Sequence, residues 1–324
     1  MNLLKRPIKL VIMIPCLNEE ETLPLVLKTI PKKIKGIDKI EILVIDDGST
    51  DKTVQVAKSL GIEHFLYHTK NQGLSRSFRH GLNRALEMGA DIIVNTEGDN
   101  QYKQEKIPEL IQPILDGQAD VVITDRQTQT IDHFSRLHKF YQKFGTWVLN
   151  KAAGTNVPDA VSGFRAYSRQ AAMQLNPVAD YSWATETTLQ AANKHQSIVI
   201  IPMATNPKLR ESRQFKSLGQ HARRSSVTII RAFIMYKPYA FFMSFGLLFL
   251  IIGGVPFVRY LVLFSIYKKP GEHLQSLIVG VVFLFASFLS FALGVIADLI
   301  RINRVLAEDT LELTKKQVFN HHQD

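Results

Sequence analysis

Residues 94–102, VNTEGDNQY, end an apolar run with two carboxylates placed one residue apart. Glu97 and Asp99 flank Gly98, and Gln101 adds an amide two positions after Asp99. Oxygen donors on a short turn suit Mg²⁺ or Mn²⁺, which keep coordination positions open for phosphate oxygens. The spacing therefore predicts a divalent-cation site formed by Glu97, Asp99 and Gln101.

Two more polar clusters follow predicted strands. PCLNEEE, residues 15–21, comes after the first strand, and DDGSTD, residues 46–51, comes after the second. Each cluster alone is also typical of a turn, and Ser49, Thr50 or Asp51 would make a good helix cap. Ligands gather at the carboxyl ends of parallel strands, so three polar clusters at three strand ends favour one shared binding site.

The usual glycine-rich phosphate loops are absent. Neither G-x-G-x-x-G nor G-x-x-x-x-G-K-[ST] follows the first predicted strand, which argues against a nicotinamide dehydrogenase and a P-loop enzyme. A nucleotide bound without such a loop needs another group to offset its diphosphate charge. A cation held by the acidic turn would supply that charge.

Strands and helices alternate through the first two-fifths of the chain. Runs rich in β-branched and apolar residues predict strands at 9–15, 39–46, 64–68 and 91–96, and amphipathic runs predict helices at 20–34, 51–61 and 73–89. Buried strands alternating with helices indicate a mostly parallel sheet covered on both faces. The predicted fold is an α/β doubly wound domain.

Two apolar runs near the C-terminal end predict a membrane hairpin. Twenty residues from Tyr239 to Val258 and twenty-two from Ser276 to Ala297 carry no formal charge, enough for a helix to cross a bilayer core. Buried helices of a water-soluble protein are the alternative, but such helices seldom lack a polar stripe. The polar residues within 264–275 predict the turn between the spans. Gly253, Gly254 and Pro256 weaken the first span as a straight helix.

The net charge of +10 limits the partners. Much of the basic excess lies beside the apolar runs, which favours lipid headgroups and phosphates over nucleic acid, for which no zinc-finger, helix-turn-helix or RNA-binding pattern is present. Seven basic residues precede the first span, and Arg301 and Arg304 follow the second, so both termini are expected in the cytoplasm. The start of the chain is read as a strand and not a signal peptide. Cys16, the single cysteine, excludes an internal disulfide and is read as a small apolar residue.

Six motifs, in this order, carry a family resemblance: IPCLNEEETL, ILVIDDGSTDKT, NQGLSRSFRHGL, NTEGDNQY, SGFRAYSR and RESR. The chain resembles the family 2 glycosyltransferases with a GT-A fold, from about Lys9 to the end of the second apolar run. More narrowly, it resembles the polyprenyl-phosphate glycosyltransferases, a group that includes the dolichol-phosphate mannose synthases. The resemblance implies a UDP- or GDP-linked sugar donor, a polyprenyl phosphate acceptor, and Mg²⁺ or Mn²⁺.

The resemblance also implies a set of donor residues. Those matching the nucleotide-sugar site are Pro15, Leu17, Glu19, Asp46, Asp47, Asn71, Gly73, Gly98 and Asp99. Glu97, Gly98 and Asp99 fall on the family's Asp-x-Asp metal motif, with Gln101 as a further ligand. Glu97 departs from the usual aspartate, so Asp99 is expected to be the main ligand and Glu97 could bind through water. The alternative for Asp99 is a turn carboxylate that caps the next segment.

A second set matches the acceptor-phosphate site: Arg126, Ser162, Gly163, Phe164, Arg165, Ser212 and Arg213. The planar guanidinium can bind two phosphate oxygens at once, although a solvated surface arginine is the commonest alternative. Glu186 resembles an acid that faces the active site in related enzymes. A carboxylate favoured by the helix dipole is an equal alternative for Glu186.

The helix expected at 136–150 departs from the family pattern. His138 and Gln142 stand where the family often has an arginine and a serine, and Lys139 or Lys143 could replace the missing charge. This amphipathic stretch could rest on the membrane surface or pack on the sheet.

These observations predict an integral protein of the plasma (inner) membrane. The expected parts are a cytoplasmic catalytic domain at 1–209, a basic juxtamembrane segment with helices at 210–237, a transmembrane hairpin at 238–300 and a cytoplasmic tail at 301–324. The implied reaction is sugar transfer to a polyprenyl phosphate with inversion of the anomeric carbon.

Two other functions stay open on the sequence. A processive polysaccharide synthase would need more membrane helices and a Gln-x-x-Arg-Trp motif, which is absent, and a non-catalytic membrane scaffold could tolerate Glu97. The sequence also leaves open the sugar, the nucleotide, the polyprenyl chain and whether the protein forms a homo-oligomer.

Overall fold

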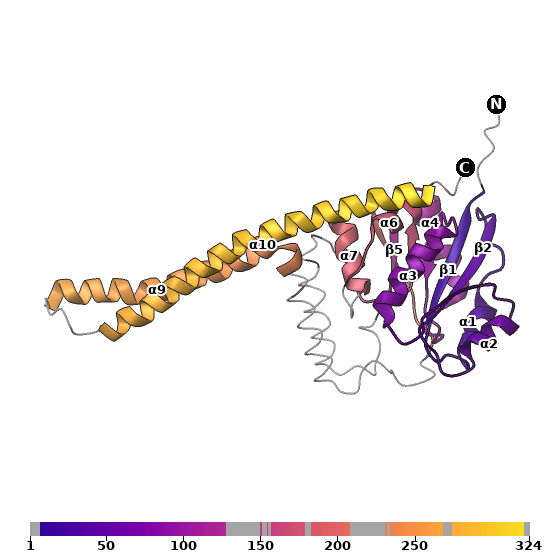
Figure 1. Cartoon of the computed structure of the whole chain (residues 1–324), viewed down its shortest axis with the longest axis horizontal. Coiled ribbons are helices and arrows are strands. Elements are labelled where there is room, and N and C mark those ends of the chain that lie inside the picture. The colour runs from indigo at the N-terminus through magenta and orange to yellow at the C-terminus, as the bar shows by residue number, and fades with distance from the viewer. Residues whose placement is uncertain are drawn as a thin grey trace, which may run out of the picture. The chain divides into compact units, whose positions relative to one another are not determined.

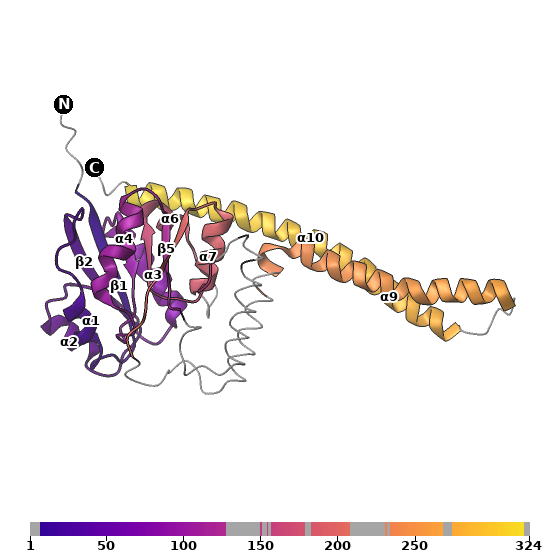
Figure 2. The ribbon, with the colours of Figure 1, turned by 180° about the vertical axis from the view of Figure 1, so that it is seen from behind.

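The computed structural model describes residues 7–127, 150, 154, 157–178, 183–207, 231, 234–267 and 274–320. It divides into two compact units: Met1–Ile229 together with Glu308–Asp324, and Ile230–Ala307. Figures 1 and 2 show the ribbon from opposite sides. The predicted domain boundaries fall at 209, 237 and 300. In the structure, the residues from Glu308 onward, which were predicted as part of a separate tail, belong to the first unit.

The first unit alternates strands and helices along most of its length. Its elements are β1 Lys9–Cys16, α1 Leu23–Thr29, β2 Lys39–Asp46, α2 Thr53–Ser59, β3 His64–Tyr67, α3 Leu74–Glu87, β4 Ile92–Asn95, the 3₁₀ turn η1 Gln104–Lys106, α4 Ile107–Leu115, β5 Val121–Asp125, β6 Arg165–Ser168, α6 Arg169–Gln174, α7 Trp183–Asn193 and β7 Ile198–Pro202. The four strands predicted before residue 100 are confirmed, with ends within two residues of the prediction.

In the described part of the chain, seven strands form one mixed sheet in the order β3-β2-β1-β4-β6-β5-β7. β1 pairs in parallel with β2 and β4, β2 pairs in parallel with β3, and β5 pairs in parallel with β7. Only β6 runs antiparallel to its neighbours, β4 and β5. The prediction of a mostly parallel α/β sheet is confirmed.

The central strand β1 shows why the sheet needs helices on both faces. Leu10, Ile12 and Ile14 are fully buried in the apolar cluster that also contains residues of α1 and α4. Met13 points to the opposite face, where α3 packs so closely that a Cβ on Gly81 would meet Ile45 and Met13. Alternate residues of a strand point to opposite faces, so a strand buried on both sides is apolar throughout.

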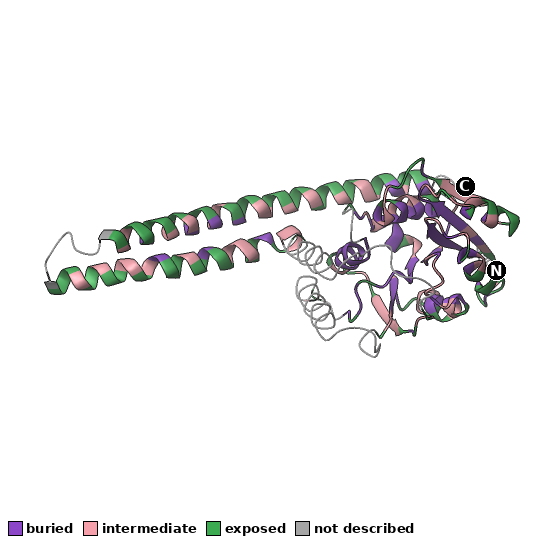
Figure 3. Cartoon of the chain, turned by 90° about the horizontal axis from the view of Figure 1, so that it is seen from below, coloured by how far each residue is buried: buried purple, intermediate pink, exposed green. Residues whose placement is uncertain are grey.

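The second unit contains α9, Pro238–Tyr267, and the first part of α10, Leu274–Asn320. Both helices are long and apolar enough to cross a membrane, as predicted. Their apolar side chains lie largely on the surface, whereas β1 and β4 of the first unit are almost entirely buried (Figure 3). α9 continues through Pro256, and Phe264–Tyr267, predicted as part of the turn, are helical.

Small residues bring α9 and α10 together. A Cβ on Gly253 would meet the backbone of Leu284 and Gly280, and Ser287 Oγ donates to the Gly246 carbonyl at 2.7 Å. Close backbone approach at small residues and hydrogen bonds from serine are the usual contacts between helices in lipid.

Helix α10 ends inside the first unit. Lys315 Nζ donates to the Leu175 carbonyl at 3.0 Å, and Gln174 Nε2 donates to Glu312 Oε1 at 2.9 Å. Phe319 is 7% exposed, and its carbonyl accepts from Arg169 Nη2 at 2.9 Å. The segment predicted as a tail is therefore helical to Asn320 and packed against α6 and its C-terminal end.

Candidate active site

Two loops at the carboxyl ends of β1 and β2 are joined by hydrogen bonds. The amide of Asn18 donates to Ser49 Oγ at 3.0 Å, and its side-chain oxygen accepts from the Thr50 amide at 2.8 Å. The amide of Glu19 donates to Thr53 Oγ1 at 2.8 Å. Asn18 has a φ of 57°, in the left-handed region that asparagine tolerates better than most residues. Of the predicted nucleotide residues, Leu17, Glu19 and Asp47 therefore lie on adjoining loops, while Pro15 and Asp46 lie in the ends of β1 and β2.

Asp46 and Asp47 are both buried but have different partners. Asp46 Oδ1 accepts from the Ser49 amide at 3.2 Å and closes the turn after β2. Asp47 Oδ1 and Oδ2 accept from the amides of Gln72 and Gly73 at 2.8 and 2.9 Å. Asp47 thus holds the start of α3, next to Asn71, which is exposed.

The turn that contains Glu97, Asp99 and Gln101, called the acidic turn, closely follows β4 and lies against the end of β1. A Cβ on Gly98 would stand 2.9 Å from Cys16 Sγ and 3.2 Å from Glu19 Cγ, so glycine allows this approach. Asp99 Oδ1 accepts from the Gln101 amide at 3.0 Å, which is the local turn contact that the alternative for Asp99 requires. That bond uses one carboxylate oxygen.

Glu97 and Asp99 together concentrate negative charge. Burial and the neighbouring Asp99 raise the pKa of Glu97 to about 7. Among the described residues, no three His, Cys, Asp or Glu side chains form a complete metal site. Two carboxylates and an amide instead fit a cation that also takes phosphate oxygens, because Mg²⁺ commonly binds through one or two carboxylates plus substrate phosphates.

A second loop, residues 162–164, packs on the acidic turn. A Cβ on Gly163 would clash with the Glu97 carboxylate. The Gly163 amide donates to Tyr102 Oη at 2.9 Å, and its carbonyl accepts from Asn95 Nδ2 at 2.7 Å. Phe164 stacks on Tyr102 with ring centroids 5.2 Å apart. The SGFR motif and the acidic turn are therefore packed together.

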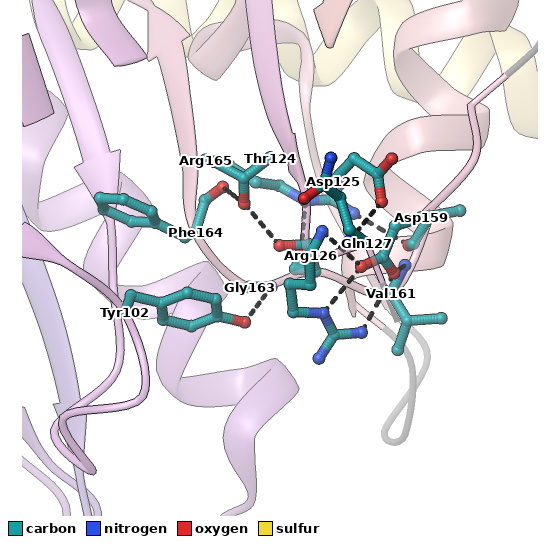
Figure 4. Close-up of polar contacts among 12 residues, drawn as sticks. Tyr102, Thr124, Asp125, Arg126, Gln127, Asp159, Val161, Gly163, Phe164 and Arg165 are labelled. Atoms are coloured by element: carbon teal, nitrogen blue, oxygen red, sulfur yellow. Dashed lines mark hydrogen bonds and ion pairs between the residues drawn. The ribbon is translucent and has the colours of Figure 1, made fainter. Parts of the chain in front are cut away.

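Arg126 lies beside this unit and is held by Asp159 (Figure 4). Its Nε and Nη2 donate to Asp159 Oδ2 and Oδ1 at 2.7 and 3.0 Å. Burial alone would lower the pKa of Arg126, but Tyr102, Asp159 and Glu97 outweigh burial. The pKa is raised above its ordinary value, so the guanidinium stays charged. Arg126 thus places a fixed positive charge near the acidic turn.

Arg165 is fully buried, unlike Arg126. Its Nε donates to the Ser162 carbonyl at 2.7 Å, Nη2 to the Ala160 carbonyl at 2.9 Å, and Nη1 to the Ala184 carbonyl at 2.8 Å. These contacts join the 160–164 loop to α7. Ser162 is also fully buried, and its Oγ lies 2.7 Å from Thr124 Oγ1. In this geometry both side chains support the loop from inside.

Other predicted residues have simpler placements. Glu186 lies in the first turn of α7, is 3% exposed, and accepts from the Val178 amide at 3.0 Å. Ser212, Arg213, His138, Lys139, Gln142 and Lys143 lie outside the described residues. The roles assigned to all of these residues stay predictions.

Four residues of this region were missed by the sequence reasoning. Asp159 fixes Arg126, Tyr102 joins the two loops, and His68 contacts Asp47. Asn206 ties the segment after β7 to the acidic turn, because its amide donates to the Gln101 carbonyl at 2.8 Å. His68 ends the predicted strand 64–68, and its position at a strand end was the feature of the sequence that could have marked it as a residue of this site.

Solved structures share the fold of this chain. Glucosyl-3-phosphoglycerate synthase from Mycobacterium tuberculosis, in complex with Mn²⁺, UDP and glucosyl-3-phosphoglycerate, aligns with a TM-score of 0.55 and 22% identity. The alignment covers 69% of this chain and 79% of that one. At this identity the likeness supports the GT-A fold alone.

Sequence relatives include transferases that act on polyprenyl phosphates. The undecaprenyl-phosphate mannosyltransferase of Micrococcus luteus is 28% identical over 200 residues, covering 59% of this chain and 80% of the relative. The UDP-N-acetylglucosamine–dolichyl-phosphate N-acetylglucosaminyltransferase of Methanococcus voltae is 26% identical over 218 residues, covering 60% and 84%. The two relatives are named for different sugars.

The family model named glycosyl transferase family 2 matches residues 11–175, just over half of the chain. The match begins in β1 and ends just after α6, so it contains the acidic turn, Arg126 and the 162–164 loop. This protein belongs to glycosyl transferase family 2.

Proposed function

We propose that this protein transfers a sugar from a nucleotide-sugar donor to a membrane polyprenyl phosphate, with inversion at the anomeric carbon. The observation that carries the proposal is the pairing of the acidic turn with Arg126 across the 162–164 loop. One side suits a diphosphate with its cation, and the other suits a phosphate monoester. Two helices able to cross a membrane agree with a lipid acceptor.

The donor occupies the carboxyl ends of β1, β2 and β4 in this proposal. Its binding residues are Pro15, Leu17, Glu19, Asp46, Asp47, Asn71, Gly73, Gly98 and Asp99, as the family resemblance implies. The loops at 17–20 and 48–53 support this assignment of the donor site, because hydrogen bonds hold the two loops next to each other at the ends of β1 and β2. Asp47 acts there by holding the loop that opens α3.

A divalent cation held by Asp99, with Glu97 and Gln101, would stabilise the negative charge that develops on the departing nucleoside diphosphate. The pKa of Glu97, raised by burial first and by the neighbouring Asp99 second, supports such a site, because a cation would stabilise two carboxylates placed close together. The relatedness to structures that contain Mn²⁺ is consistent with this role.

Arg126 positions the acceptor phosphate. Asp159 engages its Nε and Nη2, so Nη1 takes no part in that pair and can meet a phosphate oxygen. A lipid phosphate is already anionic at neutral pH, so it needs no strong base to attack the anomeric carbon. Holding this nucleophile in line with the leaving diphosphate supplies much of the rate enhancement. A single in-line displacement inverts the anomeric carbon.

The other acceptor residues have two roles in this proposal. Ser212 and Arg213 contact the phosphate as the resemblance implies. Arg165 and Ser162 act indirectly, because their contacts to Ala184 and Thr124 keep the 160–164 loop against Glu97. Arg165 is therefore a positioning residue and not a phosphate ligand.

The test is nucleoside-diphosphate release by the full-length protein in detergent. A panel of UDP- and GDP-linked sugars is supplied with Mn²⁺, with and without undecaprenyl phosphate. Release that depends on the lipid phosphate is expected for one donor or a small set of donors. Equal release without the lipid would indicate hydrolysis, and no release from any donor would favour a non-catalytic scaffold.

A further inference from the structure

A buried histidine contacts Asp47, the residue that binds the loop 70–73 before α3. His68 directly follows β3 and is 7% exposed. Its Nδ1 lies 2.7 Å from Asp47 Oδ1, and its Nε2 lies 2.9 Å from Nδ1 of His80 in α3. A carboxylate only accepts hydrogen bonds, so His68 donates from Nδ1.

The Asp47 carboxylate that contacts His68 also binds the backbone of the loop. Its Oδ1 also accepts from the Gln72 amide at 2.8 Å, and its Oδ2 accepts from the Gly73 amide at 2.9 Å. Asp47 is 5% exposed, so these three donors offset the cost of burying its charge. Rotation of this carboxylate would leave both amides without their acceptor.

The backbone around these contacts is tightly packed. Gly48, with a φ of 79°, follows Asp47, and a Cβ there would stand 2.8 to 2.9 Å from the backbone of Lys70 and Asn71. Gly73 has a φ of 90° at the start of α3. The loop 70–73 is therefore pressed against the turn after β2, and its position depends on the direction of the Asp47 carboxylate.

We propose that His68 is a positioning residue for nucleotide-sugar binding, acting through Asp47 on the loop that contains Asn71 and Gly73. The inference rests on the proposed function, in which Asn71 and Gly73 of that loop bind the donor. His68 itself touches no substrate. It fixes the carboxylate orientation that holds two amides of the loop.

Three variants separate this role from a general structural one. His68→Leu removes the donor to Asp47, whereas His68→Asn keeps an amide nitrogen at the position of Nδ1. His64→Leu is the matched control, because His64 begins β3, the strand that His68 follows, is partly exposed, and has its Nε2 3.8 Å from Glu41 Oε2. Thermal unfolding of each variant in detergent shows which proteins fold.

The first measurement is amide hydrogen exchange of the 70–74 segment in the full-length protein without ligand. His68→Leu is expected to speed exchange at Gln72 and Gly73 by about tenfold or more, since one charge-assisted contact is lost. His68→Asn and His64→Leu should exchange like the wild type. Unchanged exchange in His68→Leu, or an equal increase in His68→Asn, would overturn the inference.

The second measurement is calorimetric binding of UDP and of GDP, each with Mn²⁺. For the nucleotide that the wild type binds, His68→Leu should raise Kd by about tenfold, with the KM for undecaprenyl phosphate unchanged. His68→Asn should restore binding. Binding of neither nucleotide by the wild type would count against the proposed function, while the exchange data would still decide the role of His68.

Discussion

Asp99 occupies the turn after β4, where one carboxylate oxygen accepts from the Gln101 amide, and its charge adds to the effect of burial in raising the pKa of Glu97. We predict that Asp99→Ala lowers kcat/KM by about 10²- to 10³-fold or more while the protein stays folded, since the cation loses its main ligand. Glu97→Asp, which restores the usual family residue, should keep activity. Transfer rates over a Mn²⁺ titration would measure both effects.

Asp116 provides the control for this prediction. It ends α4 and accepts from Gln112 on the surface, so Asp116→Ala should leave transfer unchanged. Full activity of Asp99→Ala in metal-free buffer would contradict a cation site at the acidic turn.

Arg126 tests the division between donor and acceptor. Arg126→Ala should lower kcat/KM for the lipid phosphate roughly ten- to hundredfold through one lost charge-assisted contact, with nucleotide binding nearly unchanged. Kinetics with varied undecaprenyl phosphate measure the effect on the acceptor, and calorimetry with nucleotide and Mn²⁺ measures the effect on donor binding. Arg84→Ala, which removes an exposed pair with Glu87, is the control. Loss of nucleotide binding as severe as in Asp99→Ala would assign Arg126 to the diphosphate.

The Arg126–Asp159 pair also predicts a pH dependence of stability. Burial raises the pKa of Asp159, but Arg126 and backbone amides lower it below its usual value. The folded carboxylate therefore ionises more readily than the unfolded one, so the pair stabilises the fold above the unfolded pKa of about 4 and less as the pH falls. The difference in unfolding temperature between wild type and Asp159→Asn should shrink below about pH 4. A difference that grows on acidification would refute this assignment.

At the residue scale, the sequence predicted which side chains gather but not how each is used. Motif order and strand ends place Asp46 and Asp47 at the end of β2 and Glu97 after β4, two strands that both pair with β1. The direction of the Arg165 side chain depends on Ala184, which comes from α7 later in the chain. The SGFR motif alone could not show that its guanidinium points into the interior.

At the scale of elements, the four strands before residue 100 were predicted because each is a run rich in β-branched and apolar residues. β6 was not, because its four residues RAYS begin with an arginine, and the buried guanidinium donates to nearby carbonyls of Ser162 and Ala160 and to the distant carbonyl of Ala184. The C-terminal part of α10 was also missed. Its charged residues resemble a solvated tail, but in the structure Glu312 accepts from Gln174 and Lys194, and Arg169 donates to the Phe319 carbonyl.

The packing of α10 yields a stability prediction. Phe319 is buried in the first unit, so Phe319→Ala should lower the free energy of unfolding of that unit by about 3 to 5 kcal/mol. Val318→Ala is the control, because Val318 is 50% exposed. Denaturant unfolding followed by tryptophan fluorescence would measure both. Equal midpoints for the two variants would show that the end of α10 contributes little to the first unit.

At the scale of the whole molecule, we propose that both termini are cytoplasmic. Basic residues flank the outer ends of the two apolar helices more densely than the segment between them. A cysteine added after Asp324 should react with an impermeant label only from the cytoplasmic face, whereas Lys269→Cys should react only from the opposite face. The native Cys16 is 3% exposed and gives little background. The reverse labelling pattern would overturn this orientation.

The most direct test of the account is the chemical identity of the lipid product. Full-length protein is incubated with its preferred nucleotide sugar, Mn²⁺ and undecaprenyl phosphate, and the lipid fraction is analysed by mass spectrometry and NMR. The account predicts one sugar on the lipid phosphate, an anomeric configuration opposite to that of the donor, and no product with a chelator. A retained configuration, a lipid with many sugars, or free sugar without a lipid product would contradict it.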